Sequence, residues 1–151
     1  MARTPGRTTS LIALAVTSLL TAATSVAAQG LDGALGVWAD EDGISHIRIA
    51  PCGQRLCGHI IWLEAPNHSD GRPKTDDKNP DKTLRKRPLL GLTILSGLRP
   101  DRKRSKLKGR VYNAQDGNTY DVYLHPRGSR MKVEGCFFGI LCGSQVWTRV
   151  R

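Results

Sequence analysis

The chain contains 151 residues, of which 39% are hydrophobic and 24% charged, and its Lys and Arg outnumber its Asp and Glu by 23 to 13. This length allows one domain with a modest core. After a short N-terminal run, no stretch is apolar enough over ~20 residues to cross a bilayer as a helix. A formal net charge of +10 can attract anionic lipid, lipopolysaccharide or nucleic acid.

The N-terminal residues have the pattern of an export signal. Arg3 and Arg7 precede residues 11–23, an uncharged run of apolar and small residues, and further small side chains follow up to Ala28. Cleavage is expected after Ala28, with Ala27 as the second choice. An uncleaved anchor is the alternative, but the run is shorter than the ~20 apolar residues that span a bilayer.

This pattern divides the chain into two parts. Residues 1–28 are the expected signal peptide, and residues 29–151 are the expected single mature domain. The sequence therefore predicts a periplasmic or secreted protein, typical of a Gram-negative-type bacterium, with no transmembrane segment after cleavage.

Alternating apolar residues and turn signals predict about eight short strands in the mature chain. The predicted strands are residues 35–39, 44–50, 58–63, 89–98, 110–112, 118–124, 130–135 and 145–150. Short strands at this spacing indicate an antiparallel sandwich or barrel. Residues 66–82 are polar and can hold one helical turn with Asn79 as N-cap and Pro80 as its first residue. Residues 99–108 are predicted to be a charged loop.

All four cysteines lie in the mature part, where an oxidising compartment favours disulfides. Four cysteines allow three connectivities, and the local pattern favours hairpin pairs. A register with Cys52 directly opposite Cys57 puts Ile47, Ile60 and Trp62 on one apolar face, as a half-buried antiparallel pair requires. The sequence therefore predicts a Cys52–Cys57 disulfide across this hairpin.

The second predicted disulfide joins Cys136 to Cys142. With these two residues opposite each other, Met131 faces Trp147. A ring this short adds roughly 2 kcal/mol to stability. A four-thiolate zinc site is the alternative, but four and five residues separate the paired cysteines, whereas zinc pairs usually have two to four between them. A redox Cys-x-x-Cys motif is missing, which argues against a thiol–disulfide oxidoreductase.

Gly36-x-Trp38 near the start and Arg149 near the end resemble the lipocalin-like, or calycin, barrels, in which an arginine closes one barrel end by a cation–π contact with tryptophan. A longer set of motifs, in family order over nearly all the mature domain, is similar to the bacterial domain-of-unknown-function 2147 family. These motifs are Gly36-x-Trp38, Pro51-Cys52-Gly53, Leu56-Cys57-Gly58-x-Ile60-x-Trp62-Leu63, Asp77-x-Asn79-Pro80-Asp81, Leu84-Arg85-x-Arg87-Pro88-Leu89-Leu90-Gly91-Leu92, Gly109-x-Val111-Tyr112, Gly117-x-x-Tyr120, Gly135-Cys136, Leu141-Cys142 and Gln145-x-Trp147-x-Arg149.

The resemblance implies an exported protein with an all-β fold, an antiparallel lipocalin-like (calycin-type) barrel or strongly bent sheet with one short helical turn. It also implies that Trp38 and Arg149 are the residues that close the barrel. The family has no agreed activity and no catalytic residues to transfer.

No linear motif for enzymatic chemistry is present. The sequence lacks His-Glu-x-x-His, Gly-x-Ser-x-Gly, a phosphate-binding loop and a dinucleotide fingerprint. In the predicted hairpin His46 and His59 would be ~13 Å apart, too far to share one metal ion. We therefore expect no catalytic residue, metal site or cofactor. A minor alternative is a calcium site, whose ligands would be Asp76, Asp77, Asn79 and Asp81.

Positive charge is concentrated in residues 82–110, which contain eleven Lys and Arg and one acidic residue. This block has no aromatic residue on which bases could stack, and export also argues against nucleic acid as the partner. A solvated face that aids solubility is the simpler interpretation. The alternative function is a non-catalytic interaction or structural protein of the envelope, whose basic loop (residues 99–110) contacts anionic lipid or polymer. Its anion-binding candidates are Arg102, Lys103, Arg104 and Lys106.

An apolar segment lies between the last two cysteines, where exposed residues are normally polar. Phe137, Phe138, Ile140 and Leu141 either fold back as a plug of the core or form a lip that admits an apolar ligand. The leading hypothesis is a non-enzymatic envelope protein that binds a small apolar or amphipathic ligand inside the barrel. A barrel packed solid by its three tryptophans would count against this hypothesis.

Overall fold

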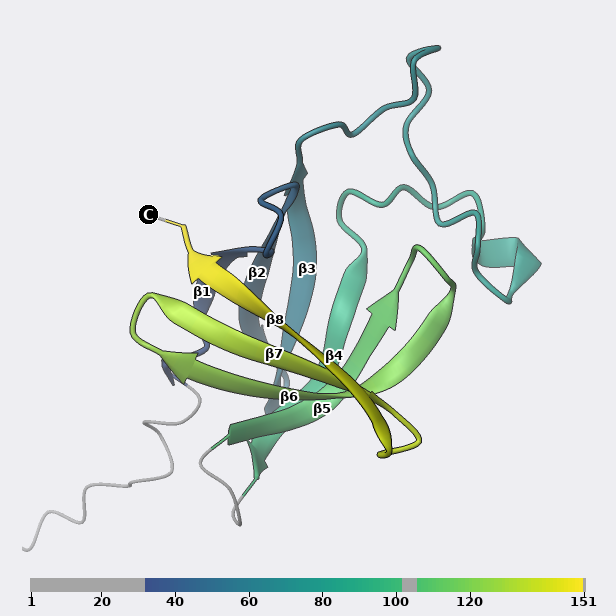
Figure 1. Cartoon of the computed structure of the whole chain (residues 1–151). Coiled ribbons are helices and arrows are strands. Elements are labelled where there is room, and N and C mark those ends of the chain that lie inside the picture. Colours follow the sequence, from purple (N-terminus) through teal and green to yellow (C-terminus); the bar gives the residue numbers. More distant parts are fainter. Residues whose placement is uncertain (1–31, 102–105, 151) are drawn as a thin grey trace, which may run out of the picture.

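Eight strands close into an antiparallel barrel, in which each strand pairs with the next along the chain and the last pairs with the first (Figure 1). The computed structural model describes residues 32–101 and 106–150, so the expected signal peptide lies outside the described residues. The strands are β1 (Gly36–Ala39), β2 (Ser45–Cys52), β3 (Arg55–Leu63), β4 (Thr93–Asp101), β5 (Lys106–Asn113), β6 (Asn118–Arg127), β7 (Arg130–Phe137) and β8 (Leu141–Arg149). The predicted all-β antiparallel barrel is confirmed.

One end of the barrel is filled by side chains, and the other end is hollow. Alternate residues of each strand point inwards because the side-chain period of a strand is two. The buried core consists of Ala34, Trp38, Ile47, Ile49, Leu56, Leu95, Leu98, Leu107, Val122, Leu124, Met131, Val133 and Trp147. Each such aliphatic side chain contributes about 1.5–3 kcal/mol on burial. The buried side chains at the filled end can therefore stabilise the fold even though the other end is not packed with side chains.

β2 and β3 pair in a register two residues away from the predicted one. Cys52 lies opposite Arg55. Cys57 lies opposite Ala50, so the predicted direct pairing of the two cysteines is wrong. The disulfide between them is nevertheless present, with Cα atoms 5.8 Å apart. A shift of two residues keeps every side chain on its own face, and the apolar alternation therefore could not distinguish the two registers.

A β-bulge at Ile61 turns Trp62 to the outside of the barrel. Ile47 pairs with Ile60, but the next pair is His46 with Trp62, so β3 has one residue more than β2 here. Trp62 is 41% exposed, and its ring lies 4.4 Å from that of His46. The prediction that Trp62 shares the inner face is wrong, because the alternation pattern does not reveal the extra residue.

β7 and β8 pair in the predicted register. Cys136 lies opposite Cys142, and Met131 lies opposite Trp147. The predicted disulfide between the two cysteines is present. In this hairpin the turn and the disulfide specify the same alignment, which distinguishes it from a register shifted by two residues.

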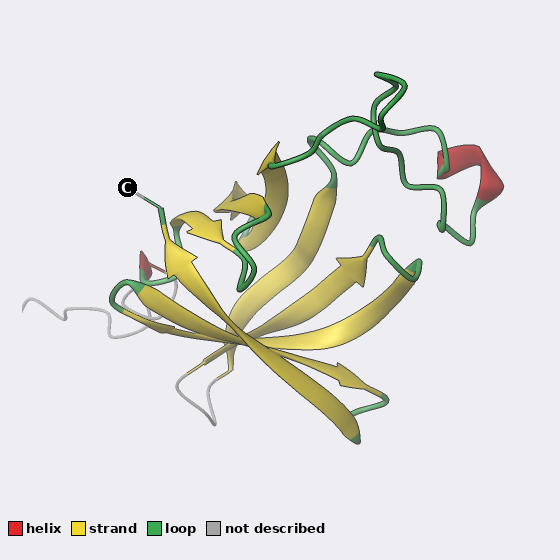
Figure 2. Cartoon of the chain, turned by 45° about the horizontal axis from the view of Figure 1, so that its top comes forward, coloured by secondary structure: helices red, strands yellow, loops and turns green. Residues whose placement is uncertain are grey.

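The long connection from β3 to β4 extends away from the strands and carries one helical turn, η1 (Lys82–Leu84) (Figure 2). Its N-cap is Asp81, whose carboxylate accepts a hydrogen bond from the N–H of Thr83. The predicted N-cap, Asn79, instead accepts from the N–H of Asp81 with its side-chain oxygen. The predicted N-cap is therefore wrong by two residues, because the side chain of Asn79 forms a turn of its own before the helix begins.

The expected charged loop at residues 99–108 is largely strand. β4 continues to Asp101, and β5 begins at Lys106. Leu98 and Leu107 point into the core from these strands and are buried. Their burial extends the hairpin and places several of the basic side chains on the outer wall of the barrel.

Candidate ligand-binding cavity

The hollow end of the barrel holds a cavity of about 750 Å³. Sites for small molecules span roughly 300–1,000 Å³. Its apolar lining consists of Ile44, Ile47, Ile60, Leu63, Leu89, Ile94, Val111, Ala114, Val133, Leu141 and Trp147. Ile47, Val133 and Trp147 also belong to the core and form the floor of the cavity. The tryptophans do not fill the space, since Trp38 is absent from the lining and Trp62 points outwards.

Two glycines leave room on the cavity side of β7 and β8. Gly135 lies directly opposite Gly143, and both line the cavity. A Cβ added to either one would meet no atom within 4 Å. The cavity therefore owes part of its volume to a cross-strand pair without side chains.

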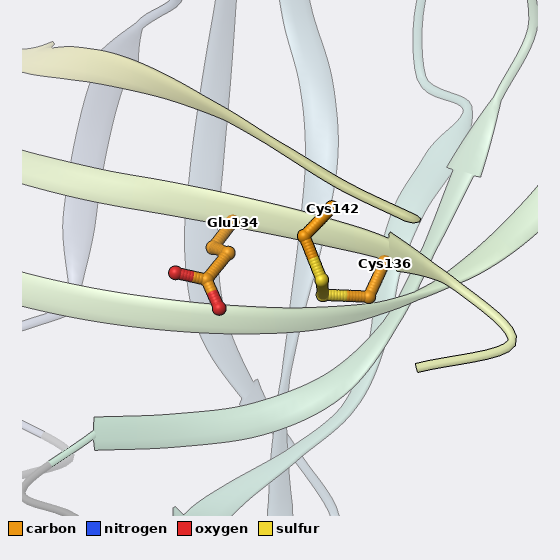
Figure 3. Close-up of side chains that lie close together, drawn as sticks. All are labelled: Glu134, Cys136 and Cys142. Atoms are coloured by element: carbon orange, nitrogen blue, oxygen red, sulfur yellow. A yellow bond between two sulfur atoms is a disulfide. The ribbon is translucent and has the colours of Figure 1, made fainter. Parts of the chain in front are cut away.

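The Cys136–Cys142 disulfide lies next to this glycine pair, on the outer face of the same two strands. Figure 3 shows Glu134 beside the disulfide, and one carboxylate oxygen of Glu134 approaches both sulfur atoms within 4.8 Å. The sulfurs are bonded to each other and do not act as thiolate ligands while oxidised. Glu134 pairs with Lys132 at 3.3 Å, and this hydrogen bond holds the pKa of Glu134 below its usual value.

The β3–β4 connection forms one side of the cavity mouth and is anchored by a buried carboxylate. Asp76 is 0% exposed and accepts a hydrogen bond from the hydroxyl of Tyr112 at 2.5 Å. Asn79 donates to Asp76 at 2.8 Å, and Arg87 forms an ion pair with it at 2.8 Å. These contacts fasten the connection to β5 and hold Leu89 against the mouth, where it lines the cavity.

The electrostatics of this anchor favour the ionised carboxylate. Burial by itself would raise the pKa of Asp76, but hydrogen bonds from Tyr112, Asn79 and Arg87 outweigh it and hold that pKa below its usual value. Burial and the neighbouring carboxylate raise the pKa of Tyr112. Asp76 and Asn79 are thus occupied in fastening the loop, whereas Asp77 is exposed and Asp81 caps η1.

The rim of the cavity is acidic along the β1–β2 turn. Asp40, Glu41 and Asp42 line the mouth. Asp40 accepts hydrogen bonds from the N–H of Ile44 and the hydroxyl of Ser45. Glu41 accepts from the N–H of Val146 on β8 and so joins the first and last strands above their short seam. The negative charge of these carboxylates would repel an anionic group of a ligand at this rim.

The apolar segment of the β7–β8 turn does not fold back into the core. Phe138 and Ile140 are each 82% exposed, and Leu141 is 72% exposed and lines the cavity. Phe137 is half-exposed, and the centroid of its ring lies 4.3 Å from that of Phe138, with the two rings tilted by 60°. Phe138 adopts a φ of 49°, which is unfavourable for a side chain of this size. The turn thus projects apolar side chains beside the mouth.

At the filled end, Arg149 closes the barrel over Trp38. Its guanidinium carbon lies 4.2 Å from the centroid of the tryptophan ring. The guanidinium also donates to the carbonyls of Leu35 at 2.7 Å and Gly33 at 2.9 Å. A Cβ on Gly36 would lie 2.6 Å from this group, so the glycine of Gly-x-Trp makes room for it.

The four basic residues expected to bind anions are not gathered in a described site. Arg102, Lys103 and Arg104 lie outside the described residues. Lys106 is 8% exposed, and its ammonium group lies 3.6 Å from the centroid of the Tyr123 ring. Lys106 is therefore engaged in a cation–π contact on the outer wall.

Comparison with known proteins identifies the family. Residues 36–149 match the sequence profile of DUF2147, described as an uncharacterized protein conserved in bacteria. The chain belongs to the DUF2147 family. No curated protein sequence matches this DUF2147 protein. Among solved structures it is similar to protein HP1028 of Helicobacter pylori, described as belonging to the lipocalin family, with a TM-score of 0.64 and 24% identity over 78% of this chain and 82% of that chain.

The likeness to HP1028 shows a shared lipocalin-like fold, to which the hollow barrel and its closure by Trp38 and Arg149 also correspond. The two disulfides of the DUF2147 protein are consistent with an extracytoplasmic location. Within the described residues no helix has the length and apolar character needed to cross a membrane.

Sequence reasoning missed several residues that shape the cavity of this DUF2147 protein. Gly135 and Gly143 carry no linear motif, but the predicted β7–β8 register places them opposite each other and could have indicated the gap. The contact between Asp76 and Tyr112 joins residues 36 positions apart, and no local pattern indicates it.

Proposed function

We propose that this protein binds a small apolar or amphipathic ligand in the open end of its barrel, without catalysing a reaction. The observation that carries the proposal is the 750 Å³ cavity, whose floor and walls are mainly aliphatic. Lipocalin-like folds are compatible with such a site, although the fold by itself does not assign a function.

The acidic rim refines the class of ligand. Asp40, Glu41 and Asp42 surround one side of the mouth, so a neutral or cationic head group is favoured over a carboxylate or sulfonate. Phe138, Ile140 and Leu141 act as a lip that receives the apolar part of the ligand before it enters the cavity. The positive φ of Phe138 supports this role, because strained backbone positions cluster at ligand-binding and active sites.

We also propose that residues 1–28 are removed on export and that the domain of residues 29–151 works in the periplasm or outside the cell. The two disulfides support this location. Mass spectrometry of the protein from its native compartment should give a chain that begins at Gln29. A chain that retains the first 28 residues would contradict the export proposal.

Ligand binding is tested with two fluorescent probes that share an aromatic body. N-phenyl-1-naphthylamine is neutral, and anilinonaphthalene sulfonate is its anionic counterpart. We expect the neutral probe to bind more tightly to the wild type. In Gly135→Leu the new side chain occupies the cavity, and the neutral probe should lose at least tenfold in affinity.

The matched control is Val146→Leu on the outer face of β8, which should bind the probe as the wild type does. Thermal unfolding of both variants shows whether the fold is retained. The proposal fails if the wild type does not bind the neutral probe, or if Gly135→Leu binds it with unchanged affinity. Native mass spectrometry of protein from its own periplasm then identifies a co-purified ligand.

A further inference from the structure

A second hollow, of about 280 Å³, lies on the outer wall of the barrel across β3, β4, β5 and β6. It shares no lining residue with the cavity inside the barrel. Four cationic side chains surround it, and Asp121 is the single acidic residue of its lining. The four cations are Arg55, Arg99, Lys108 and Arg110.

Two glycines, Gly97 and Gly109, line this hollow between the basic side chains. Between the pairs Ser96–Arg110 and Arg99–Lys108, β4 has two residues where β5 has only Gly109. Gly97 takes the extra position with a φ of 63°, which defines a glycine β-bulge. A Cβ on Gly109 would lie 2.6 Å from the carbonyl oxygen of Ser96. The same Cβ would lie 2.9 Å from the buried side chain of Leu98, so glycine at 109 lets β4 and β5 approach closely at the bulge. At Gly97 the nearest atom to an added Cβ is a guanidinium nitrogen of Arg55 at 3.9 Å, so the absence of a side chain there leaves the hollow open.

The bulge also brings the charges together. Beyond it, Arg99 lies directly opposite Lys108 on the outer face. Arg55 reaches across from β3, and its guanidinium approaches the carbonyl oxygen of Gly97 at 3.5 Å. Like charges directly opposite each other destabilise a sheet, so this arrangement has a local cost.

Among the described residues, carboxylates neutralise the cluster only in part. In the part of the chain that the structure describes, Arg110 pairs with Asp121 at 3.7 Å, and both side chains are more than half exposed. Arg55, Arg99 and Lys108 form no ion pair within the same described residues. An external anion would offset the repulsion between Arg99 and Lys108.

We propose that this hollow is a binding site for a phosphate group, either of a lipid head group or of a small soluble phosphate. Guanidinium groups bind phosphate oxygens in pairs of parallel hydrogen bonds, and three of the four cations here are arginines. The missing side chain at Gly97 leaves space for the phosphate beside the guanidinium group of Arg55. The site is independent of the ligand in the barrel and leaves that cavity free.

Inorganic pyrophosphate is the first probe, measured by calorimetry at low ionic strength with the full mature domain. Arg99→Gln combined with Lys108→Gln should weaken binding at least tenfold. The control is Arg127→Gln combined with Arg130→Gln, which removes the same charge from another directly opposed basic pair outside the hollow. The control should stay within twofold of the wild type.

The variant with Arg99→Gln and Lys108→Gln should unfold at the same temperature as the wild type or at a higher one, because it removes a repulsive cross-strand pair. A loss of pyrophosphate binding in this variant then reports the site and not unfolding. Equal weakening in both double variants would show that net charge alone attracts the anion and would overturn the proposal. Absence of pyrophosphate binding to the wild type would overturn it as well.

Vesicles distinguish the two sources of phosphate. If the site holds a lipid head group, vesicles of phosphatidylglycerol should sediment the wild type, vesicles of phosphatidylcholine should not, and pyrophosphate should compete. The variant that lacks Arg99 and Lys108 should then remain in the supernatant. If pyrophosphate binds and vesicles do not, the site takes a soluble phosphate compound.

Discussion

Gly135 of β7 lies directly opposite Gly143 of β8, and the two strands therefore have no side-chain contact on the cavity side at this point. The next pair toward the turn is Cys136 with Cys142, and its disulfide joins the same strands on the outer side. The covalent bond thus replaces the packing that the glycines omit. A hairpin can in this way border a cavity and still keep its strands together.

Replacing Cys136 and Cys142 by serine should lower the free energy of unfolding by about 2 kcal/mol, as expected for so short a ring. Amide hydrogen exchange should accelerate near the tip of β7 and β8, because the glycine pair is then held by the backbone ladder without side-chain packing on the cavity side. Urea unfolding and hydrogen exchange with mass-spectrometric detection measure the two effects.

The control is the same replacement at Cys52 and Cys57. Its stability loss should be similar, but exchange in β2 and β3 should change less, because Ile47 and Ile60 still pack across that hairpin. Equal acceleration in both hairpins would contradict the role assigned to the second disulfide.

Asp76→Asn should destabilise the protein by about 2 kcal/mol at neutral pH, since it weakens charge-assisted hydrogen bonds with Arg87 and Tyr112. The folded-state pKa of Asp76 is lowered, so its contribution is complete above the unfolded pKa of about 3.9 and is lost as the pH falls through the folded value. The difference between variant and wild type should therefore shrink below about pH 4. Urea unfolding between pH 7 and pH 3 measures it.

Asp77→Asn is the control for this anchor, because Asp77 is the exposed neighbour on the same loop. It should leave stability within about 0.5 kcal/mol of the wild type. If the two variants behave alike, the loop is not anchored through Asp76.

His125 should make the protein less stable in mild acid. Burial, with a further contribution from nearby Lys106, lowers its pKa in the folded state. The unfolded chain then takes up a proton below about pH 6.5 that the folded protein resists, so stability falls as the pH drops through this range. Its Nε2 atom is buried and lacks a hydrogen-bond partner among the described residues.

His125→Gln should flatten the melting temperature between pH 7.5 and pH 5.5, as followed by circular dichroism. His68→Gln in the exposed part of the β3–β4 connection should preserve the wild-type slope. An unchanged slope in His125→Gln would assign the acid sensitivity elsewhere.

Gly117→Ala should loosen the β3–β4 connection. Gly117 has a φ of 75°, and a Cβ there would overlap the carbonyl oxygen of Lys78. Gly128→Ala is matched in backbone, with a φ of 61°, but meets no atom within 4 Å. Gly128→Ala should lower the free energy of unfolding by about 1 kcal/mol, because alanine is disfavoured in the left-handed backbone conformation. Gly117→Ala should lower the free energy of unfolding by more than this and should make the connection more susceptible to limited proteolysis. Equal loss of stability and equal cleavage in the two variants would show that the contact with Lys78 does not contribute.

Local patterns predicted most of the barrel and part of its detail. The strands followed from alternation, and the β7–β8 register followed because cysteines, apolar residues and turn all agree on one alignment. The β2–β3 register was two residues off because both alignments keep Ile47 and Ile60 on the inner face. Trp62 was misplaced because a bulge adds a residue without altering composition.

The sequence by itself determined the strand number, both disulfide pairs and the family, since each depends on residues close in the chain or on their order. Only the tertiary structure decided that the barrel is hollow at one end, that Asp76 reaches Tyr112, and that Arg55 joins Arg99 and Lys108 around a second hollow. These features depend on how strands distant in sequence curve and close upon one another. The physical reason is that apolar alternation specifies the face of the sheet on which a side chain lies. The volume of the cavity and the distances between charged groups depend in addition on the side chains of strands that are distant in sequence.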